Sequence, residues 1–251
     1  MAANEMRTGE VIWRELMTLD IERAKGFYGE LFGWSFDAMP MPEGTYTIVK
    51  AAGQGIAGMM PSPKEGGAPP MWLSYVSVPD TDAACAAAKA QGGTVVFGPV
   101  SMEGVGRMAT LLDFDMAAMA VMTPTGQGEK RPEQPGLHTF CWETLASSDP
   151  ERAKAFYGAV CGWKDASGTA GMPVLATEGG VQVCDLQKAQ NMPPSWLTYV
   201  VVESIEASNA RVGKLGGTVM VPRIDIPRVG AISVVGDPFG AMLGLFVPSM
   251  G

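Results

Sequence analysis

The stretch "ERAKGFYGELFGW" spans Glu22–Trp34, and a near-copy, "ERAKAFYGAVCGW", spans Glu151–Trp163. The two stretches lie 129 positions apart (151 minus 22), and the same offset carries Trp13 onto Trp142. A long signature that recurs at a fixed spacing indicates an internal duplication.

A second pair of matching segments extends the duplication towards the end of each copy. "WLSYVSV" (Trp72–Val78) corresponds to "WLTYVVV" (Trp196–Val202) at an offset of 124 (196 minus 72). That offset also carries Asp113 onto Asp237. The second copy is therefore five residues shorter between the two landmarks (129 minus 124), and the landmarks otherwise align without gaps.

The segment between the copies has the composition of a linker. "TPTGQGEKRPEQPG", residues 123–136, is rich in proline, glycine and charge and shows no apolar period. We therefore predict two domains, residues 1–125 and 134–251, joined by a linker over residues 126–133.

Each copy is predicted to contain the order strand, helix, strands twice. Asp20 is a typical N-cap, and Gly33 a typical C-terminal stop. Between them, apolar residues recur at helical spacing at Ala24, Phe27, Tyr28 and Leu31. The later strand of each copy leads into a second helical run, "DAACAAAKAQ" at residues 82–91 in the first copy. The helices are too few for a doubly wound parallel sheet, so the pattern favours an α+β fold.

The signature and the turn "DPFG" at residues 237–240 resemble the vicinal oxygen chelate superfamily. This superfamily includes glyoxalase I, bleomycin-resistance proteins and extradiol dioxygenases, and the resemblance covers nearly the whole chain. It implies four βαβββ modules paired into two glyoxalase-like half-barrel domains, each curled around a cavity.

The resemblance also implies where a metal would bind. Enzymes of the superfamily hold a divalent ion with histidine, glutamine or glutamate side chains from the first and last strands of their modules. The corresponding positions here are Trp13, Leu73, Trp142, Leu197, Ala120 and Gly244. None of these side chains ligates a metal, so we predict no metal and no cofactor. An atypical site built from Glu15, Gln182 and Asp185 remains the alternative.

Side chains alternate along a strand, so Glu15 and Met17 share the face of Trp13 and are expected to line the cavity with it. The predicted ligand-binding residues are Trp13, Met17, Leu73, Tyr75, Trp142, Thr144, Leu197 and Tyr199. Glu15 is the candidate catalytic residue, because a carboxylate facing an apolar cavity must be paired, protonated or used. The alternatives are that Trp13 is a core residue and that Glu15 reaches solvent or an arginine such as Arg107.

Composition narrows the possible partners and chemistry. The chain has 251 residues and a net charge of −8, and it has no basic cluster, which disfavours nucleic acid. It has no long apolar run and no apolar leader, so we expect a cytoplasmic protein that does not bind membranes. Its four cysteines lack CxxC spacing and are expected to be buried thiols. No Ser-His-Asp triad is assignable with the single histidine, His138, which is predicted to be a polar residue at the domain junction.

The sequence therefore predicts a protein that binds a small apolar or aromatic molecule, on the pattern of the bleomycin-resistance relatives. The alternative is a lyase, isomerase or hydroxylase-type enzyme that acts on a small oxygenated substrate through Glu15 or an atypical metal site. A third possibility is an interaction scaffold with collapsed cavities. We expect a monomer or a weak dimer, because tandem domains already supply the pairing of the half-barrels.

Overall fold

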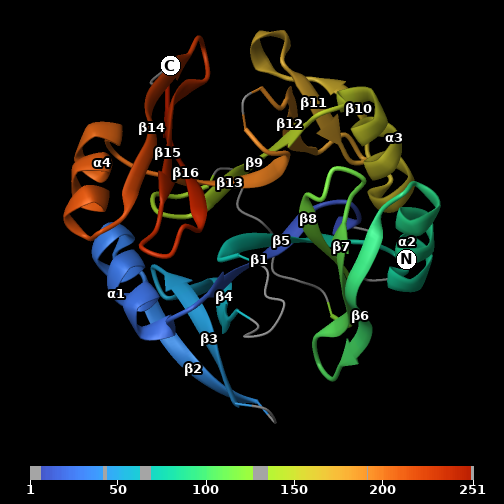
Figure 1. Ribbon diagram of the computed structural model, residues 1–251, viewed down its shortest axis with the longest axis horizontal. Coiled ribbons are helices and arrows are strands. Elements are labelled where there is room, and N and C mark those ends of the chain that lie inside the picture. Colours follow the sequence, from blue (N-terminus) through green and yellow to red (C-terminus); the bar gives the residue numbers. More distant parts are fainter. Residues whose placement is uncertain (1–6, 42–43, 63–68, 127–134, 191, 250–251) are drawn as a thin grey trace. The chain divides into compact units, whose positions relative to one another are not determined.

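The computed structural model describes residues 7–41, 44–62, 69–126, 135–190 and 192–249 (Figure 1). Its α-helices are α1 (Ile21–Phe32), α2 (Thr81–Ala90), α3 (Pro150–Cys161) and α4 (Ile205–Lys214), with a short 3-10 turn at Thr169–Gly171. The strands of the first copy are β1 (Val11–Thr18), β2 (Ser35–Met41), β3 (Gly44–Ala51), β4 (Gln54–Pro61), β5 (Met71–Ser77), β6 (Thr94–Met102), β7 (Gly106–Leu112) and β8 (Ala118–Pro124). Those of the second are β9 (Phe140–Ser147), β10 (Lys164–Ser167), β11 (Pro173–Ala176), β12 (Gln182–Lys188), β13 (Ser195–Val201), β14 (Thr218–Ile226), β15 (Gly230–Gly236) and β16 (Met242–Pro248).

The strands form four modules with one topology. The strand orders are β2-β3-β4-β1, β5-β8-β7-β6, β10-β11-β12-β9 and β13-β16-β15-β14. In each module the first strand pairs parallel with the last, and the other pairings are antiparallel. A helix follows the first strand of every module. The prediction of an α+β fold built from four βαβββ modules is therefore confirmed.

The signature helices α1 and α3 begin and end as their sequences predict. The Asp20 side chain accepts from the backbone N–H of Arg23 at 3.0 Å, and Asp149 accepts from that of Arg152 at 3.1 Å. Both helices end at a glycine with positive φ, Gly33 at 69° and Gly162 at 72°. A side chain would be strained in this left-handed conformation, which explains the glycine of each copy.

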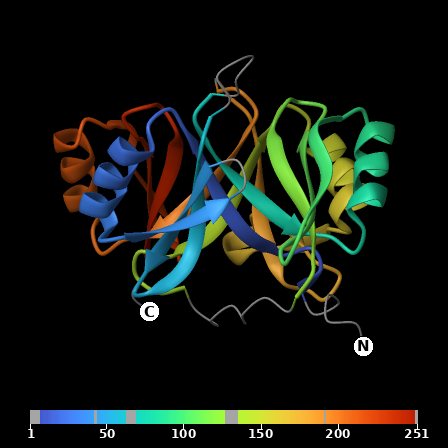
Figure 2. The same ribbon diagram turned by 90° about the horizontal axis from the view of Figure 1, so that it is seen from below.

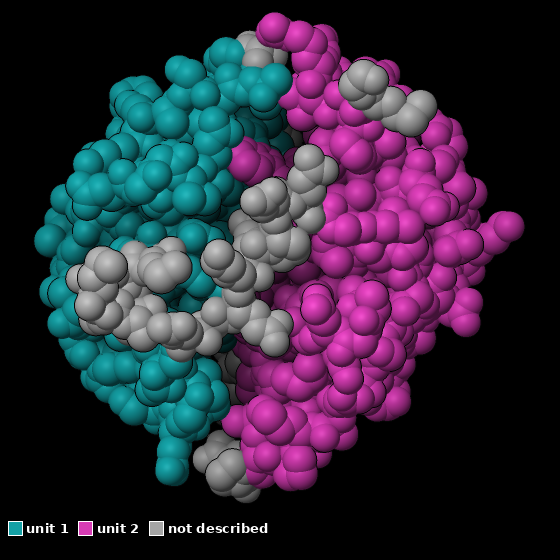
Figure 3. Space-filling model, turned by 180° about the vertical axis from the view of Figure 1, so that it is seen from behind, with its two compact units in different colours: residues 1–12, 73–131, 143–196 teal, residues 13–72, 132–142, 197–251 magenta. Residues whose placement is uncertain are grey.

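Residues group into two compact units that differ from the two sequence copies (Figure 3). Unit 1 contains residues 1–12, 73–131 and 143–196, and unit 2 contains residues 13–72, 132–142 and 197–251. Each unit thus combines a module from each copy. The domain boundaries 1–125 and 134–251 remain a prediction drawn from the duplication. Of the predicted linker, 126–133, all but residue 126 lies outside the described residues.

The core of unit 2 connects the two motifs that carried the resemblance. The hydroxyl of Tyr28, in the first signature, donates to Oδ2 of Asp237 at 3.2 Å and accepts from Nε1 of Trp72 at 3.0 Å. The other oxygen of Asp237 accepts from the backbone N–H groups of Phe239 and Ala241 at 2.8 and 2.9 Å. The signature of the first copy is therefore held by the turn of the second.

Unit 1 contains the same network with the copies exchanged. Tyr157 donates to Oδ2 of Asp113 at 2.8 Å and accepts from Nε1 of Trp196 at 2.9 Å. Burial raises the pKa of both aspartates and of both tyrosines. Because the tyrosines stay neutral, each donates a hydrogen bond to its aspartate across the physiological pH range.

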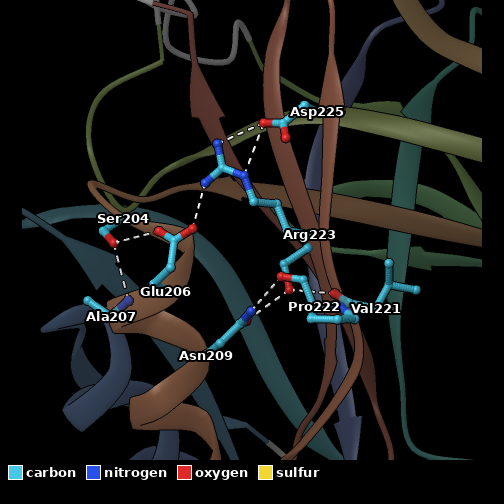
Figure 4. Close-up of polar contacts among 9 residues, drawn as sticks. Ser204, Glu206, Ala207, Asn209, Val221, Pro222, Arg223 and Asp225 are labelled. Atoms are coloured by element: carbon cyan, nitrogen blue, oxygen red, sulfur yellow. Dashed lines mark hydrogen bonds and ion pairs between the residues drawn. The ribbon is translucent and has the colours of Figure 1, made fainter.

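Within each unit, the two helices lie side by side: α1 beside α4 in unit 2, and α2 beside α3 in unit 1 (Figures 1 and 2). Polar contacts also hold α4 to the edge strand β14 (Figure 4). Arg223 pairs with Glu206 and Asp225, both at 2.7 Å, and the Asn209 amide donates to the carbonyl of Pro222 at 2.7 Å. No helix among the described residues is long and apolar enough to span a bilayer.

Candidate functional site

Three side chains on the sheet of the first module form a connected aromatic and acidic cluster. Trp13 and Glu15 come from β1 and Tyr46 from β3. The Trp13 indole donates to the Tyr46 hydroxyl at 2.9 Å, and that hydroxyl hydrogen-bonds to the Glu15 carboxylate. We call Trp13, Tyr46 and Glu15 the β1 cluster. The structure thus joins two of the predicted residues through a tyrosine that the sequence reasoning missed.

Two glycines of β4 leave room for the rings of the β1 cluster. Glu15 registers with Gly58 on the parallel strand. A Cβ atom at Gly58 would lie 1.8 Å from the Tyr46 hydroxyl oxygen, and one at Gly55 would lie 4.0 Å from Cη2 of Trp13. The Tyr46 ring therefore lies over a position where any side chain would collide with it. A glycine within a strand often marks the place where a neighbouring ring lies over the backbone, so Gly58 on β4 is the signal that could have identified Tyr46 on β3.

The electrostatics of the β1 cluster determine that the Tyr46 hydroxyl keeps its proton. Burial, and next the negative charge of Glu15, raise the pKa of Tyr46 well above its usual range. Tyr46 is therefore a neutral donor to Glu15, whose side chain is buried (6% exposed). Arg107, which we considered as a partner of Glu15, binds Asp82 of α2 instead, with Nη2 2.8 Å from Oδ1.

The corresponding sheet of the second copy carries different chemistry. Thr144 of β9 occupies the place of Glu15 and registers with Asp185 of β12, as Glu15 registers with Gly58. Thr144 donates to Oδ1 of Asp185 at 2.6 Å, and Gln187 donates to Oδ2 at 2.7 Å. Each copy therefore has one carboxylate in this pair of registered residues. In the first copy it is Glu15, on the first strand of the module, and in the second it is Asp185, on the last strand. Asp185 was considered only as an atypical metal ligand, and Gln187 was not identified from the sequence.

The remaining predicted residues lie on the sheets of their own modules. Tyr75 of β5 registers with Ala120 of β8, and Tyr199 of β13 registers with Gly244 of β16. A Cβ atom at Gly244 would lie 2.2 Å from Cδ1 of Tyr199, so this ring covers β16. The other predicted residues are Met17 on β1, Leu73 on β5, Trp142 on β9 and Leu197 on β13, of which Leu73 is buried and the rest are partly exposed.

The positions that the superfamily uses for metal ligands do not fit a divalent ion here. The four equivalent rows are Glu15–Gly58, Tyr75–Ala120, Thr144–Asp185 and Tyr199–Gly244. Each row supplies at most one carboxylate, none supplies a histidine, and the first-strand ligand positions carry only tryptophan or leucine. Gln182 is exposed and donates to the Ser167 carbonyl at 3.2 Å. Within the described ranges, no three histidine, cysteine, aspartate or glutamate side chains gather as a metal site.

Two surface hollows are formed by other residues. In unit 1 a hollow of about 600 Å³ is lined by Thr8, Val78, Pro79, Asp80, Ala83, Ala84, Ala159, Val160, Cys161, Gly162, Glu178 and Gly179. In unit 2 a hollow of about 320 Å³ is lined by Arg223, Asp225, Ile226, Pro227, Gly230, Ala231, Val247, Pro248 and Ser249. Neither lining contains a residue that was predicted to bind ligand.

Comparison with known proteins finds a family model and full-length relatives that are similar to this chain. Residues 10–50 match the family model described as bleomycin resistance protein-like N-terminal. The protein CFP32 of Mycobacterium tuberculosis, which carries the name of a glyoxylase, is 31% identical over 256 residues, covering 98% of this chain and 97% of the relative. The anthracycline biosynthesis protein DnrV of Streptomyces peucetius is 28% identical over 259 residues, covering 93% and 91%.

Solved structures agree in fold. The Mn(II)-bound glyoxalase from Novosphingobium aromaticivorans superimposes with a TM-score of 0.64 at 15% identity, covering 96% of this chain and 82% of that one. The 2,3-dioxygenase LapB from Pseudomonas sp. KL28 gives 0.60 at 13% identity, covering 97% and 92%. At such identities the likeness shows the fold alone. Together with the full-length relative, it confirms the expectation raised by the duplicated signature: the chain belongs to the vicinal oxygen chelate superfamily.

Proposed function

We propose that the chain binds a small planar aromatic molecule against Trp13 and Tyr46, without the divalent metal of the superfamily's enzymes. The observation that carries the proposal is the β1 cluster. Trp13 and Tyr46 are both partly exposed residues, and the bond from the Trp13 indole to the Tyr46 hydroxyl fixes their rings relative to each other. A surface that is ordered before binding loses little side-chain entropy when a flat ligand stacks on it.

The polar end of the cluster favours a ligand that carries oxygen. The Tyr46 hydroxyl accepts from the Trp13 indole and donates to the buried Glu15 carboxylate, so a ligand hydroxyl that approaches the Tyr46 oxygen meets an acceptor. Apolar surroundings with a few placed polar groups are typical of small-molecule sites. The names of two relatives, which place them in anthracycline biosynthesis, support an aromatic ligand because anthracyclines contain fused, hydroxylated rings.

The test is a titration with 1,4-dihydroxyanthraquinone as probe, followed by its visible absorbance. We expect saturable binding that weakens by about tenfold or more, roughly 1.4 kcal/mol, in Trp13→Leu. The matched change Trp142→Leu, at the same position of the second copy, controls for loss of a tryptophan. Absence of binding, or equal loss in both variants, would refute the assignment to the β1 cluster.

The metal-free part of the proposal has a separate test. Elemental analysis of the purified protein should find no stoichiometric divalent metal, because the donor positions carry tryptophan, leucine, alanine and glycine. Dialysis against EDTA should leave the affinity for the probe unchanged. An affinity that depends on added Mn²⁺ or Fe²⁺ would overturn this part alone.

The alternative, a lyase, isomerase or hydroxylase-type enzyme for a small oxygenated substrate, rests on the same carboxylate. Glu15 is buried and held by Tyr46, a position from which a carboxylate can take a proton from a bound substrate. Glu15→Gln keeps the shape of the side chain and removes the base. Substrate turnover that disappears in this variant while binding persists would favour the enzyme over the binder.

A further inference from the structure

The two units carry equivalent helix pairs that differ in how the end of one helix is bonded. At the 124-residue offset, α2 (Thr81–Ala90) corresponds to α4 (Ile205–Lys214), and at the 129-residue offset α1 corresponds to α3. The pair α4 and α1 belongs to unit 2, and the pair α2 and α3 to unit 1 (Figure 2). The contacts of one helix pair can therefore be compared position by position with those of the other.

In unit 2, two side chains bind the last carbonyl groups of α1. Nη1 of Arg211, on α4, lies 3.4 Å from the carbonyl oxygen of Glu30 and 3.3 Å from that of Leu31. The His138 side chain hydrogen-bonds to the backbone of Phe32. The last four carbonyls of a helix lack partners within it and carry the negative end of its dipole, so a cation is stabilised there.

In unit 1, the corresponding positions bear no donor side chain. Arg211 is replaced by Ala87 (211 minus 124), and His138 by Gly9 (138 minus 129). The structure supports the second equivalence, because Trp34 donates to the carbonyl of His138 at 2.8 Å and Trp163 to that of Gly9 at 2.7 Å. Near the end of α3, Ala87 and Gly9 therefore stand where unit 2 has the side chains of Arg211 and His138.

The 600 Å³ hollow of unit 1 borders the end of α3, and from α2 its lining takes Ala83 and Ala84. Its lining includes Ala159 and Val160, which correspond to Glu30 and Leu31, the two residues bound by Arg211. The carboxylate residues Asp80 and Glu178 also line it; Asp80 caps the start of α2, and Glu178 pairs with Lys164 at 2.9 Å.

We propose that this hollow binds a small molecule bearing a guanidinium group. The group occupies the place that Arg211 fills in unit 2 and donates to the carbonyl oxygens of Ala159 and Val160. A planar guanidinium stays charged and presents several donors at once, so it can bind two adjacent carbonyls as Arg211 does. The site is separate from the β1 cluster and does not depend on its function.

The test is isothermal titration of the full chain with agmatine, using putrescine as a diamine without a guanidinium group. We expect one agmatine site per chain and an affinity for putrescine that is lower by tenfold or more. Ala87→Arg installs the side chain of unit 2 and should abolish agmatine binding. Ala86→Arg, one residue away on the exposed side of α2, adds the same charge outside the lining and should leave binding unchanged.

A second variant covers the case in which Ala87→Arg does not fold. Ala83 is exposed and lines the hollow, so Ala83→Lys places a competing cation at its mouth, with Ala86→Lys as control. We expect a loss of at least tenfold in affinity in the first and less than twofold in the second.

The reciprocal experiment uses unit 2. Arg211→Ala should open an equivalent site there, lower the melting temperature, and raise the agmatine stoichiometry from one to two, with partial recovery of the melting temperature by agmatine. No saturable agmatine binding by the unmodified chain, or binding that is insensitive to both Ala87→Arg and Ala83→Lys, would overturn the proposal.

Discussion

Removal of one buried hydroxyl, in the variant Tyr28→Phe, should destabilise the protein through the partners that it leaves behind. The hydroxyl accepts from Trp72 at 3.0 Å and donates to Asp237 at 3.2 Å, and both partners are buried, at 6% and 4% exposed. An unsatisfied buried group costs about 1–3 kcal/mol, and more when it is charged. Two such groups give an expected loss of about 2–5 kcal/mol, which allows for partial relaxation.

The assay is urea denaturation at pH 7 followed by far-UV circular dichroism, with an unchanged dependence on urea as evidence that the folded state is intact. For a chain of this size each kcal/mol corresponds to about 2–4 °C in melting temperature, so thermal unfolding gives a second measure. Tyr157→Phe is the matched variant, because Tyr157 makes the same two bonds in unit 1. Amide exchange should then quicken around α1 in the first variant and around α3 in the second.

The dependence on pH sharpens the prediction. Burial raises the pKa of Asp237 in the folded protein. A carboxyl with a raised folded pKa contributes stability that is fully present below the unfolded value, about 3.9, and that is lost as pH rises through the folded value. Because the bond from Tyr28 lowers this pKa, Tyr28→Phe should raise it further and lose more stability at pH 8 than at pH 5. A loss under about 0.5 kcal/mol, or one that is larger at pH 5, would refute the reasoning.

Three further results are expected. Gly58→Ala should displace Tyr46, because the new Cβ would lie 1.8 Å from its hydroxyl oxygen; we expect a loss of about 1–3 kcal/mol in urea denaturation and weaker binding of the anthraquinone probe. Burial lowers the pKa of His138 in the folded protein, so the stability that depends on its neutral form is present above the unfolded value of about 6.5 and should be lost as pH falls below it towards the folded value. His138→Asn, which tolerates the φ of 59°, should flatten this part of the pH profile. Residues 1–125 and 134–251, expressed separately, should each lack cooperative thermal unfolding and regain it on mixing, because each compact unit takes modules from both; a cooperative transition in either half alone would contradict this.

Much of the fold follows from local signals in the sequence. Asp20 and Gly33 limit α1 as capping chemistry requires, and the same pair of signals recurs in α3. The duplication supplied the number of modules, since a repeated unit repeats its topology. What local signals do not contain is the partner of each module. Tyr28 and Asp237 are 209 positions apart, and nothing in either motif indicates that it bonds to the other copy.

The candidate site divides in the same way. Alternation along β1 placed Trp13 and Glu15 on one face, and the structure joins them through a third residue. Tyr46, and the pairing of Asp185 with Thr144, could not be found by alternation alone, because each depends on the register between strands. A shift of one residue would have turned either side chain to the opposite face of its sheet.

The exchange of partners between copies suggests why the two halves could diverge in chemistry while keeping one fold. Each signature tyrosine is bound by the other copy's turn, so a change in either motif disturbs a core that both copies build. The sheet rows that contain Glu15 and Thr144, and the contact of Arg211 with the end of α1, are not matched between the copies in this way. At those places the copies differ: Glu15 and Gly58 in one correspond to Thr144 and Asp185 in the other, and Arg211 corresponds to Ala87. The duplicated core, with its tyrosine–aspartate bonds, thus constrains the fold. Distinct binding sites are expected at the residues outside these bonds. Titrations with an aromatic probe and with a guanidinium probe would distinguish those sites.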